Sequence, residues 1–434
     1  MQNLLLSLLL FGSIATHAQT NLSLTQALEL GLKNRYDLQA DALNLSLAVN
    51  TVQKTRNAWL PTVTASGNVR YNTQLQKTVL PAGAFGNAEA QRLAFGTRNS
   101  TVLSLDLTQP LYRPEHKTDL AIGQNTFQLE RERHTQQQTN AKVGIAEAYL
   151  NVLLRELQRS VAQSDAARNQ TYFELSEGKH RLGTLPEADF LNARLQTETS
   201  RQSAQTAEQN YRQAQATLCY RLNIPTDTTL VLTDRIENQS LTDDLSQSEG
   251  AVLNRTELRQ SQLQQEGFAL QSRRVQEGLK PTVSLYGNYS AQFLANDFNY
   301  VGQPWNPFNY VGLQVSVPLS ARLTRRTNQQ TYQLQARQTE LRRQQTETDI
   351  AHELRQARTD FNNARTNLQS TRTSLDVARQ LSELQQAQYR LGTRLYSQVL
   401  DAEKSVQAAQ QSYLEAAYAF LVARLNYEKA LGKY

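Results

Sequence analysis

The sequence predicts a mainly α-helical chain that also carries a β-barrel portion. Two long segments without proline, 115–185 and 319–434, repeat apolar residues at alternating steps of three and four, which is typical of helices that pack like coiled coils. Four shorter segments alternate apolar and polar residues, which is typical of strands with two different faces. The 434 residues include only 10 Pro, so the usual breaks between small globular domains are missing.

Composition excludes several classes of protein. The mean hydropathy of −0.58 is too low for a bundle of membrane-spanning helices. A single cysteine, Cys219, excludes a disulfide framework and any cysteine-rich metal site. The 45 Lys and Arg exceed the 39 Asp and Glu by a net charge of +6, which is too mild over this length to indicate a nucleic-acid-binding protein.

Residues 1–18 are interpreted as a secretory signal peptide. A short apolar core, 4–11, precedes small residues and an expected cleavage site, Ala15-Thr16-His17-Ala18, before Gln19. The amino-terminal region lacks the usual Lys or Arg, and a short buried helix is the alternative. Export is favoured, and Gln19 gives no indication of lipidation.

An internal repeat divides the mature chain into two copies of one unit. Pro61-Thr62-Val63 recurs as Pro281-Thr282-Val283, and Arg181-Leu182-Gly183-Thr184 recurs as Arg390-Leu391-Gly392-Thr393. The first repeat is expected at 19–250 and the second at 251–434. The first contains expected strands at about 62–75 and 100–112 and long helices at about 117–178 and 185–223. The second contains expected strands at about 282–294 and 309–319 and long helices at about 322–390 and 395–431.

The strand segments have the length of strands that cross a bilayer. Val63 and Val69 belong to an alternating pattern in the first repeat, as Val311 and Val315 do in the second. Segments of roughly ten residues match tilted transmembrane strands. The strands of a soluble β-sandwich alternate in the same way, so this pattern alone leaves both interpretations open.

The helical segments carry narrow apolar seams. One seam runs from Ile350 to Ala378 and includes Phe361, and another runs from Val399 to Tyr427. The many small alanines favour close packing against neighbouring helices. A helix over 117–178 would be on the order of 90 Å long, which is longer than a single globular core.

Four strands are too few to close a membrane barrel, since the smallest such barrels have about eight. An open sheet is excluded from lipid, because every backbone N–H and C=O there needs a partner. If the strands lie in a membrane, several chains must therefore share one barrel. The helical seams are likewise expected to pack against helices of other chains.

With these features the chain resembles the TolC family of outer-membrane efflux proteins over essentially all of its length after the signal. The resemblance rests on the duplicated strand–strand–helix–helix unit and on two segments of sequence. These segments are Tyr389-Arg390-Leu391-Gly392-Thr393-Arg394 followed by Val399-Leu400-Asp401-Ala402, and Arg181-Leu182-Gly183-Thr184 followed by Asp189 and Leu191-Asn192-Ala193.

The resemblance implies an architecture and a function. It implies a homotrimer whose four strands per chain form a twelve-stranded barrel in the outer membrane, continued across the periplasm by an α-barrel of long coiled-coil-like helices. Such an assembly is the exit duct of a tripartite efflux or type I secretion system. It docks to a periplasmic adaptor (membrane fusion) protein and, through the adaptor, to an inner-membrane pump.

The resemblance also implies roles for particular residues. Asp189, Tyr389 and Arg394 match the positions whose links close a gate at the periplasmic helix tips. Gln398 and Asp401 match two acidic positions at the pore constriction, so a single acidic ring with weaker cation selectivity is expected here. The tip residues expected to contact the adaptor are Arg181, Leu182, Gly183, Thr184, Arg390, Leu391, Gly392 and Thr393.

The sequence offers no candidate for catalysis, for a cofactor or for a metal site, and an enzyme is not expected. The mature histidines, at 116, 134, 180 and 352, are not spaced as metal ligands, and no motif of a phosphate loop, a zinc protease or a serine hydrolase occurs. Cys219 is interpreted as a small packing residue. Trp305 and its aromatic neighbours fit either a girdle at the lipid–water interface or a packed loop cluster. The neighbours are Phe298, Tyr300, Phe308 and Tyr310.

The leading function is therefore a passive export conduit in the bacterial outer membrane that extends into the periplasm. The alternative is a periplasmic or surface-exposed structural coiled-coil protein without a pore; against it, the connections at 76–99 and 294–308 are interpreted as outward loops. A nucleic-acid-binding coiled coil is disfavoured by the signal and by Arg being matched with Glu along the helices. The sequence does not identify the exported substrate, whether drug, metal ion or protein, because an open duct makes few selective contacts.

Overall fold

The computed structural model describes residues 20–82, 89–228, 230–235, 255–302, 304–391, 393–394 and 396–433. The signal peptide expected at 1–18 lies outside these residues. The chain divides into two compact units, and each takes segments from both repeats. The first unit consists of Met1–Asn44, Glu132–Arg259 and Arg343–Tyr434, and the second consists of Leu45–Arg131 and Gln260–Arg342.

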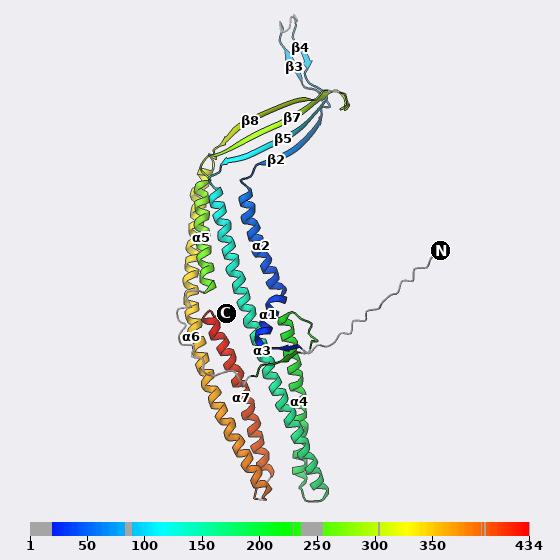
Figure 1. Cartoon of the computed structure of the whole chain (residues 1–434), viewed down its shortest axis with the longest axis vertical. Helices are drawn as coiled ribbons and strands as arrows, with labels where there is room; N and C mark the ends of the chain where they lie inside the picture. Colours follow the sequence, from blue (N-terminus) through cyan, green and yellow to red (C-terminus); the bar gives the residue numbers. More distant parts are fainter. Residues whose placement is uncertain are drawn as a thin grey trace, which may run out of the picture. The chain divides into compact units, whose positions relative to one another are not determined.

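The second unit is organised around a four-stranded antiparallel sheet. Its strands pair in the order β2-β5-β7-β8, so that the β5–β7 pairing joins the hairpin of one repeat to the hairpin of the other (Figure 1). Each strand lies close to a segment in which apolar and polar residues alternate. The strands are β2 (Thr62–Tyr71), β5 (Asn99–Tyr112), β7 (Thr282–Ala295) and β8 (Asn306–Ser316).

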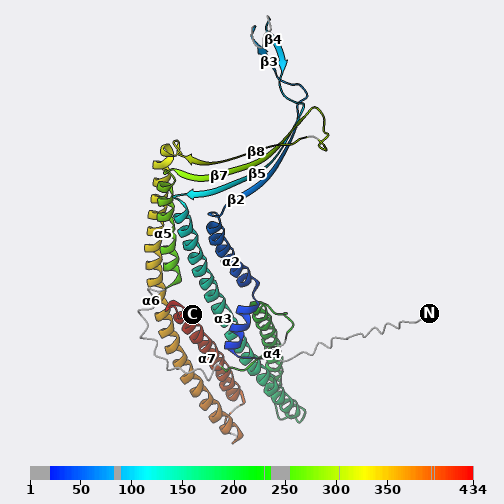
Figure 2. The same cartoon turned by 45° about the horizontal axis from the view of Figure 1, so that its top comes forward.

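The register gives the sheet a helix end and a loop end. At one end of the sheet β2 and β7 begin and β5 and β8 finish, since Tyr112 lies opposite Val283 and Thr282 lies opposite Ser316. This end is called the helix end, because helices precede or follow each strand there, and the other is called the loop end. The register shifts near Pro110, because proline has no N–H to donate to the ladder. Figure 2 shows the four strands curving together as one sheet.

Two smaller strand pairs also occur. In the connection 76–99, which was expected to be a loop, β3 (Lys77–Leu80) and β4 (Gln91–Ala94) form an antiparallel hairpin. In the first unit β1 (Thr20–Leu22) pairs in parallel with β6 (Leu230–Leu232). Strands of three or four residues are too short to produce a recognisable alternation.

Four long helices follow the strands. Pro114 and Pro186 stand just before two of them. Proline is tolerated there, because a backbone N–H at the start of a helix has no carbonyl partner within the helix. Asn223 ends one helix in the left-handed conformation at φ 55°, so that its N–H reaches the carbonyl oxygens of Cys219 and Tyr220. The helices are α3 (His116–Arg181), α4 (Glu187–Leu222), α6 (Ala321–Arg390) and α7 (Tyr396–Ala430).

Three shorter helices precede the strands: α1 (Leu24–Asn34) and α2 (Tyr36–Asn57) come before β2, and α5 (Thr256–Glu277) comes before β7. α1 starts with a capping box between Ser23 and Gln26. α2 and α5 end shortly before Pro61 and Pro281. Within the described ranges, no helix combines the length and the apolar character of a membrane-spanning helix.

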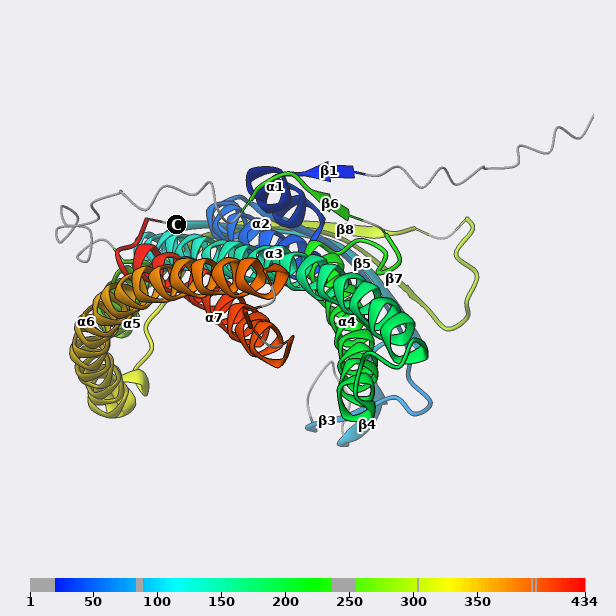
Figure 3. The same ribbon diagram turned by 90° about the horizontal axis from the view of Figure 1, so that it is seen from below.

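The two apolar seams of the second repeat pack against each other. Phe361 is 8% exposed, and its ring centroid lies 5.4 Å from that of Phe420 and 5.6 Å from that of Tyr427. Figure 3 shows α6 and α7 side by side. The expectation that other chains fill these seams is therefore corrected, because each seam is covered by the other helix of the same chain. Further core residues come from α1, α3 and α4.

Candidate functional site

One face of the four-stranded sheet is polar. Thr64, Asp106 and Asn288 stand in register on three neighbouring strands, and Asn288 Nδ2 donates to Asp106 Oδ1 at 2.6 Å. On the next rung of the same face, Ser290 Oγ donates to Ser104 Oγ at 3.0 Å. A row of hydrogen-bonded polar groups suits a face that lines an aqueous interior.

The opposite face of the sheet is apolar and open. Val63, Leu107 and Val311 lie on one line across the sheet, and they are 66%, 38% and 78% exposed. Soluble monomers rarely leave so extended an apolar surface in water, whereas lipid contact requires it. Other exposed apolar residues of this face are Val69, Leu103, Leu105, Leu313 and Val315.

Aromatic residues gather on the apolar face at the loop end. Phe293 is fully buried under Tyr300 and Trp305, whose ring centroids lie 4.7 and 5.5 Å from its own. Tyr71 and Phe298 stack at 5.4 Å. These residues form a packed cluster on the face where an interfacial girdle would lie. Phe308 and Tyr310, which were expected to join them, lie instead on the polar face, opposite Ser290 and Asn288.

The edge strands β2 and β8 have open outer sides. In the described part of the chain, the sheet order begins at β2 and ends at β8, and no further strand pairs with either. Every residue of β2 and all but one residue of β8 are exposed. Unpaired backbone N–H and C=O groups in a row form a template for another strand.

The turn between α3 and α4 exposes the first of the two expected tips. Gly183 has a φ of +70°, a left-handed conformation that glycine adopts without a Cβ clash. The backbone N–H and the hydroxyl of Thr184 donate to the carbonyl oxygen of Lys179 at 3.0 and 2.9 Å. Arg181 is exposed and Leu182 is 79% exposed, so the tip presents an apolar side chain to a partner.

Aromatic stacking holds the two helices of this tip together. The ring of His180 lies 4.7 Å from that of Phe190 at an interplanar angle of 10°, and Phe173 stacks on the same Phe190 ring at 5.8 Å. His180 Nε2 also lies 3.1 Å from a carboxylate oxygen of Glu187. These contacts fix the position of the first turn of α4 against the last turn of α3.

The turn between α6 and α7 repeats the hydrogen bonds of the first tip. The N–H and the hydroxyl of Thr393 donate to the carbonyl oxygen of Gln388 at 3.0 and 2.9 Å, five residues back as at Thr184. Leu391 is 79% exposed, as Leu182 is. Among the described residues, the repeated Arg-Leu-Gly-Thr sequence therefore forms the same threonine hydrogen bonds twice.

Two of the three expected gate residues, Asp189 and Arg394, have described side chains. Arg394 donates from Nε to Gln388 Oε1 at 3.1 Å, and Asp189 is half-buried in the first turn of α4. Among the described residues, no hydrogen bond or ion pair links Arg394 to Asp189. The side chains of Tyr389 and Arg390, and the whole of Gly392, lie outside the described residues.

The expected constriction residues share one side of α7. Asp401 is exposed, whereas its neighbours Val399 and Ala402 are 3% and 5% exposed and belong to the seam. Gln398 is half-buried, one turn before Asp401, and residues three apart on a helix lie on the same face. The carboxylate of Asp401 is therefore turned away from the α6–α7 core.

A polar link between α3 and the α6–α7 pair escaped the sequence analysis. The hydroxyl of Tyr172 donates to Glu403 Oε1 at 3.1 Å, and Gln386 Nε2 lies 3.4 Å from the same oxygen. Burial raises the pKa of the Glu403 carboxyl. The sequence contains no signal for this link, since Arg424 and Glu428 of α7 also follow directly after seam residues, as Glu403 does.

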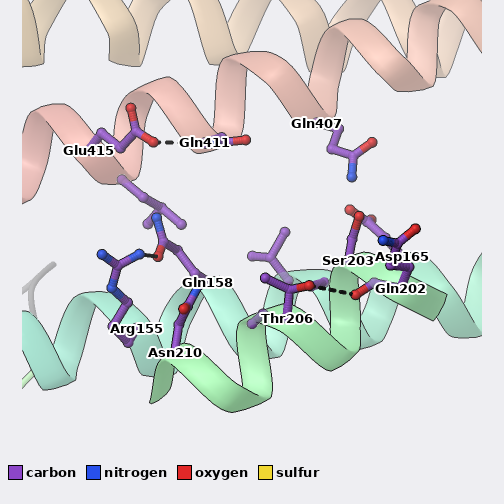
Figure 4. Close-up of a pocket in the computed structure, with 14 residues that line it drawn as sticks. Arg155, Gln158, Asp165, Gln202, Ser203, Thr206, Asn210, Gln407, Gln411 and Glu415 are labelled. Atoms are coloured by element: carbon purple, nitrogen blue, oxygen red, sulfur yellow. Dashed lines mark hydrogen bonds between the residues drawn. The ribbon is translucent and has the colours of Figure 1, made fainter. Parts of the chain in front are cut away.

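A polar groove of about 390 Å³ lies between α3, α4 and α7. Asp165, Ser203 and Gln407 are among its lining residues (Figure 4). Asp165 is 7% exposed and pairs with Arg168 through Oδ1, while its Oδ2 has no partner among the described atoms, and burial raises the pKa of its carboxyl. In the described ranges, no three His, Cys, Asp or Glu side chains gather as metal ligands would.

Comparison with known proteins decides the family. A family model described as "Outer membrane efflux protein" matches residues 27–222 and 248–433, which is most of the chain. The chain belongs to this family. It is an outer-membrane exit duct, as the sequence resemblance predicted, and its family is one of transport channels rather than of enzymes. The alternative of a structural coiled-coil protein without a pore is set aside.

Individual relatives of this outer membrane efflux protein agree with the family. The outer membrane protein TolC of Escherichia coli K12 is 24% identical over 355 residues, which cover 77% of this chain and 70% of TolC. The open-state MtrE channel of Neisseria gonorrhoeae superposes with a TM-score of 0.74 at 16% identity, over 94% of this chain and 88% of MtrE. VceC of Vibrio cholerae superposes with a TM-score of 0.72 at 14% identity, over 94% of this chain and 96% of VceC. These structures confirm the mainly helical channel fold.

Proposed function

We propose that three copies of this efflux protein close a twelve-stranded barrel in the outer membrane, with the long helices continuing as an α-barrel in the periplasm. The observation that carries the proposal is the sheet itself, which has one polar face, one apolar face and two open edges. Because lipid offers no partner to backbone N–H and C=O groups, β8 of one copy would pair with β2 of the next. Three sheets of four strands give an even number within the known range of membrane barrels.

The two faces of the sheet then have separate surroundings. Residues such as Val63 and Val311 would contact lipid, and the hydrogen-bonded row through Asp106 and Asn288 would line the water-filled interior. This division supports a passive conduit, because the groups on the interior face are compatible with water. The duct would serve a tripartite efflux or type I secretion system.

The two helical tips are the proposed contact with the periplasmic adaptor, and through the adaptor with an inner-membrane pump. Leu182 and Leu391 are each 79% exposed, and the same threonine hydrogen bonds follow them. Two equivalent apolar side chains per chain would give a trimer six similar docking points. The remaining proposed contacts are Arg181, Gly183, Thr184, Arg390, Gly392 and Thr393.

The gate is proposed at the same end of the helices. Closing would require Arg394 to exchange its neutral bond to Gln388 for a charge-assisted, forked bond to Asp189, which Arg forms better than Lys. Tyr389 would add a hydroxyl link.

Asp401 is proposed to form the constriction, beside Gln398. In a threefold assembly its three carboxylates would lie close together and attract multivalent cations. Channels reconstituted in planar lipid bilayers should therefore be blocked by a trivalent cation added on the periplasmic side. Asp401→Asn should weaken that block by about tenfold or more, since three charges are lost together.

Glu415→Gln provides the matched control for this experiment. Glu415 is another exposed carboxylate on α7, and its replacement removes the same three charges from the assembly at a different level of the helix. The block should be unchanged in this variant. An Asp401→Asn channel that is blocked as readily as the parent would place the acidic ring elsewhere and remove this part of the proposal.

A further inference from the structure

The helix end of the sheet carries a net positive charge as large as that of the whole chain. The ten residues beyond each of the four strand ends there contain ten Lys and Arg against three Asp and Glu, a net charge of +7, which exceeds the +6 of the whole chain. The corresponding residues at the loop end contain three Lys and Arg against two Asp and Glu. The charge is therefore concentrated at one end of a sheet that has an apolar face.

Three of these cations open α6 in an unfavourable position. Arg322, Arg325 and Arg326 lie in its first two turns, and this helix has no acidic residue in its first turn. The positive end of the helix dipole repels cations, and Arg322 lies on the same face as the other two. All three side chains are exposed, and none has an ion pair among the described residues. The arginines repel one another and the positive helix end, and no acidic side chain of the described residues pairs with them. Such uncompensated charge is typical of a binding surface.

Exposed apolar residues lie at both edges of this end of the sheet, before β2 and after β8. Leu319 and Leu323 are 74% and 84% exposed, and Leu60 is 59% exposed at the start of β2. Trp59 is 38% exposed, and its ring lies 5.1 Å from that of His116. Tryptophan, leucine and arginine at the same end of a sheet are typical of a surface that lies between hydrocarbon and water.

We infer that the helix end of the sheet binds the anionic headgroups of phospholipids in the periplasmic leaflet of the outer membrane. The inference rests on the proposed barrel, which places this end of the sheet at the periplasmic membrane surface. Arg326 is only ten residues beyond Ser316, and six helical residues rise about 9 Å. Arg322 therefore lies near the headgroup layer, and the long side chains of Arg325 and Arg326 can reach back to it. Phosphate groups there would neutralise the arginines and the positive end of α6 together.

The test measures lipid preference of the full-length protein. The purified assembly in detergent is titrated with phosphatidylglycerol or with phosphatidylcholine of the same acyl chains, and bound lipid is counted by native mass spectrometry. The parent should prefer phosphatidylglycerol. Each arginine replaced by glutamine should weaken that preference about fivefold, so the triple variant R322Q/R325Q/R326Q should lose about a hundredfold. The triple lysine variant should keep most of it.

The control is R365Q/R372Q/R379Q, which removes three exposed arginines from the middle of the same helix. This variant should keep the lipid preference of the parent. No preference in the parent, or equal losses in the two glutamine variants, would overturn the inference. A change of pore ion selectivity in R322Q/R325Q/R326Q without a change of lipid preference would also overturn it, because the arginines would then face the interior.

The mass and the conductance of the same sample separate this inference from the proposed function. A parent protein that is trimeric and conducts ions but shows no lipid preference would contradict only the lipid inference. A parent that neither forms trimers nor conducts would contradict the proposed barrel and the lipid inference together.

Discussion

Replacing Phe361 with Asp is expected to abolish assembly of the folded protein. Phe361 is 8% exposed between Phe420 and Tyr427. Loss of a buried aromatic side chain costs about 3–5 kcal/mol, and burial of an unpaired carboxylate adds several more. The sum approaches the whole unfolding free energy of a typical domain, about 5–15 kcal/mol. Detergent extracts of the outer-membrane fraction, separated by size exclusion with light scattering, should contain no assembled protein.

Asn362→Asp is the matched control, because it adds the same charge one residue further along, at an exposed position. This variant should assemble as the parent does. Phe361→Leu keeps an apolar side chain and should assemble with reduced thermal stability. Normal assembly of Phe361→Asp would show that the α6–α7 seam does not hold the chain together.

Combining Arg394→Ala with Tyr389→Phe is expected to open the duct. Each link at the partly wet tips should contribute only about 1 kcal/mol. Three symmetric copies that break together would shift a two-state opening by several kcal/mol. Single-channel conductance should rise, and cells should become more sensitive to large antibiotics that the outer membrane normally excludes. Arg365→Ala, an exposed arginine of α6 away from the tip, should change neither property.

A double-mutant cycle tests whether Arg394 and Asp189 are partners. Asp189→Ala should resemble Arg394→Ala, and the double variant should be no leakier than either single variant. Partners that act only through each other lose one interaction in all three variants. Additive effects on conductance would show that the two residues are not linked, and the proposed gate would have to be abandoned.

The long elements could be predicted from the sequence because each repeats one period many times. The seam from Ile350 to Ala378 requires a buried helix face, and residues of this seam such as Ile350 and Phe361 are buried. The alternation around Val63 and Val311 requires two unlike sheet faces, and the register provides them. Both patterns extend over enough residues to outweigh local exceptions.

Other features depend on information that a periodic pattern does not contain. A heptad seam specifies that a face is buried but not which helix buries it, so the pairing of α6 with α7 in one chain was missed. α2 carries exposed leucines, Leu43 and Leu47 at 64% and 62%, and such a helix has no clear buried stripe. The link from Tyr172 to Glu403 joins residues 231 positions apart, which no local pattern reveals.

The two sequence repeats and the two compact units divide the chain differently. The repeats run one after the other, whereas each compact unit takes parts of both. The reason is visible in the sheet, where β5 of the first repeat pairs along its length with β7 of the second. Once the two hairpins share one sheet, the helical segments of both repeats that adjoin it belong to the same unit.

The mass of the intact particle in detergent tests the central claim most directly, namely that three copies share one barrel. Native mass spectrometry of the full-length protein, extracted from outer membranes, should give a particle of three chains that needs detergent to stay in solution. The open edges of β2 and β8 call for strands of other copies, and the exposed apolar face of the sheet calls for detergent. A folded monomer that is stable without detergent would contradict the account.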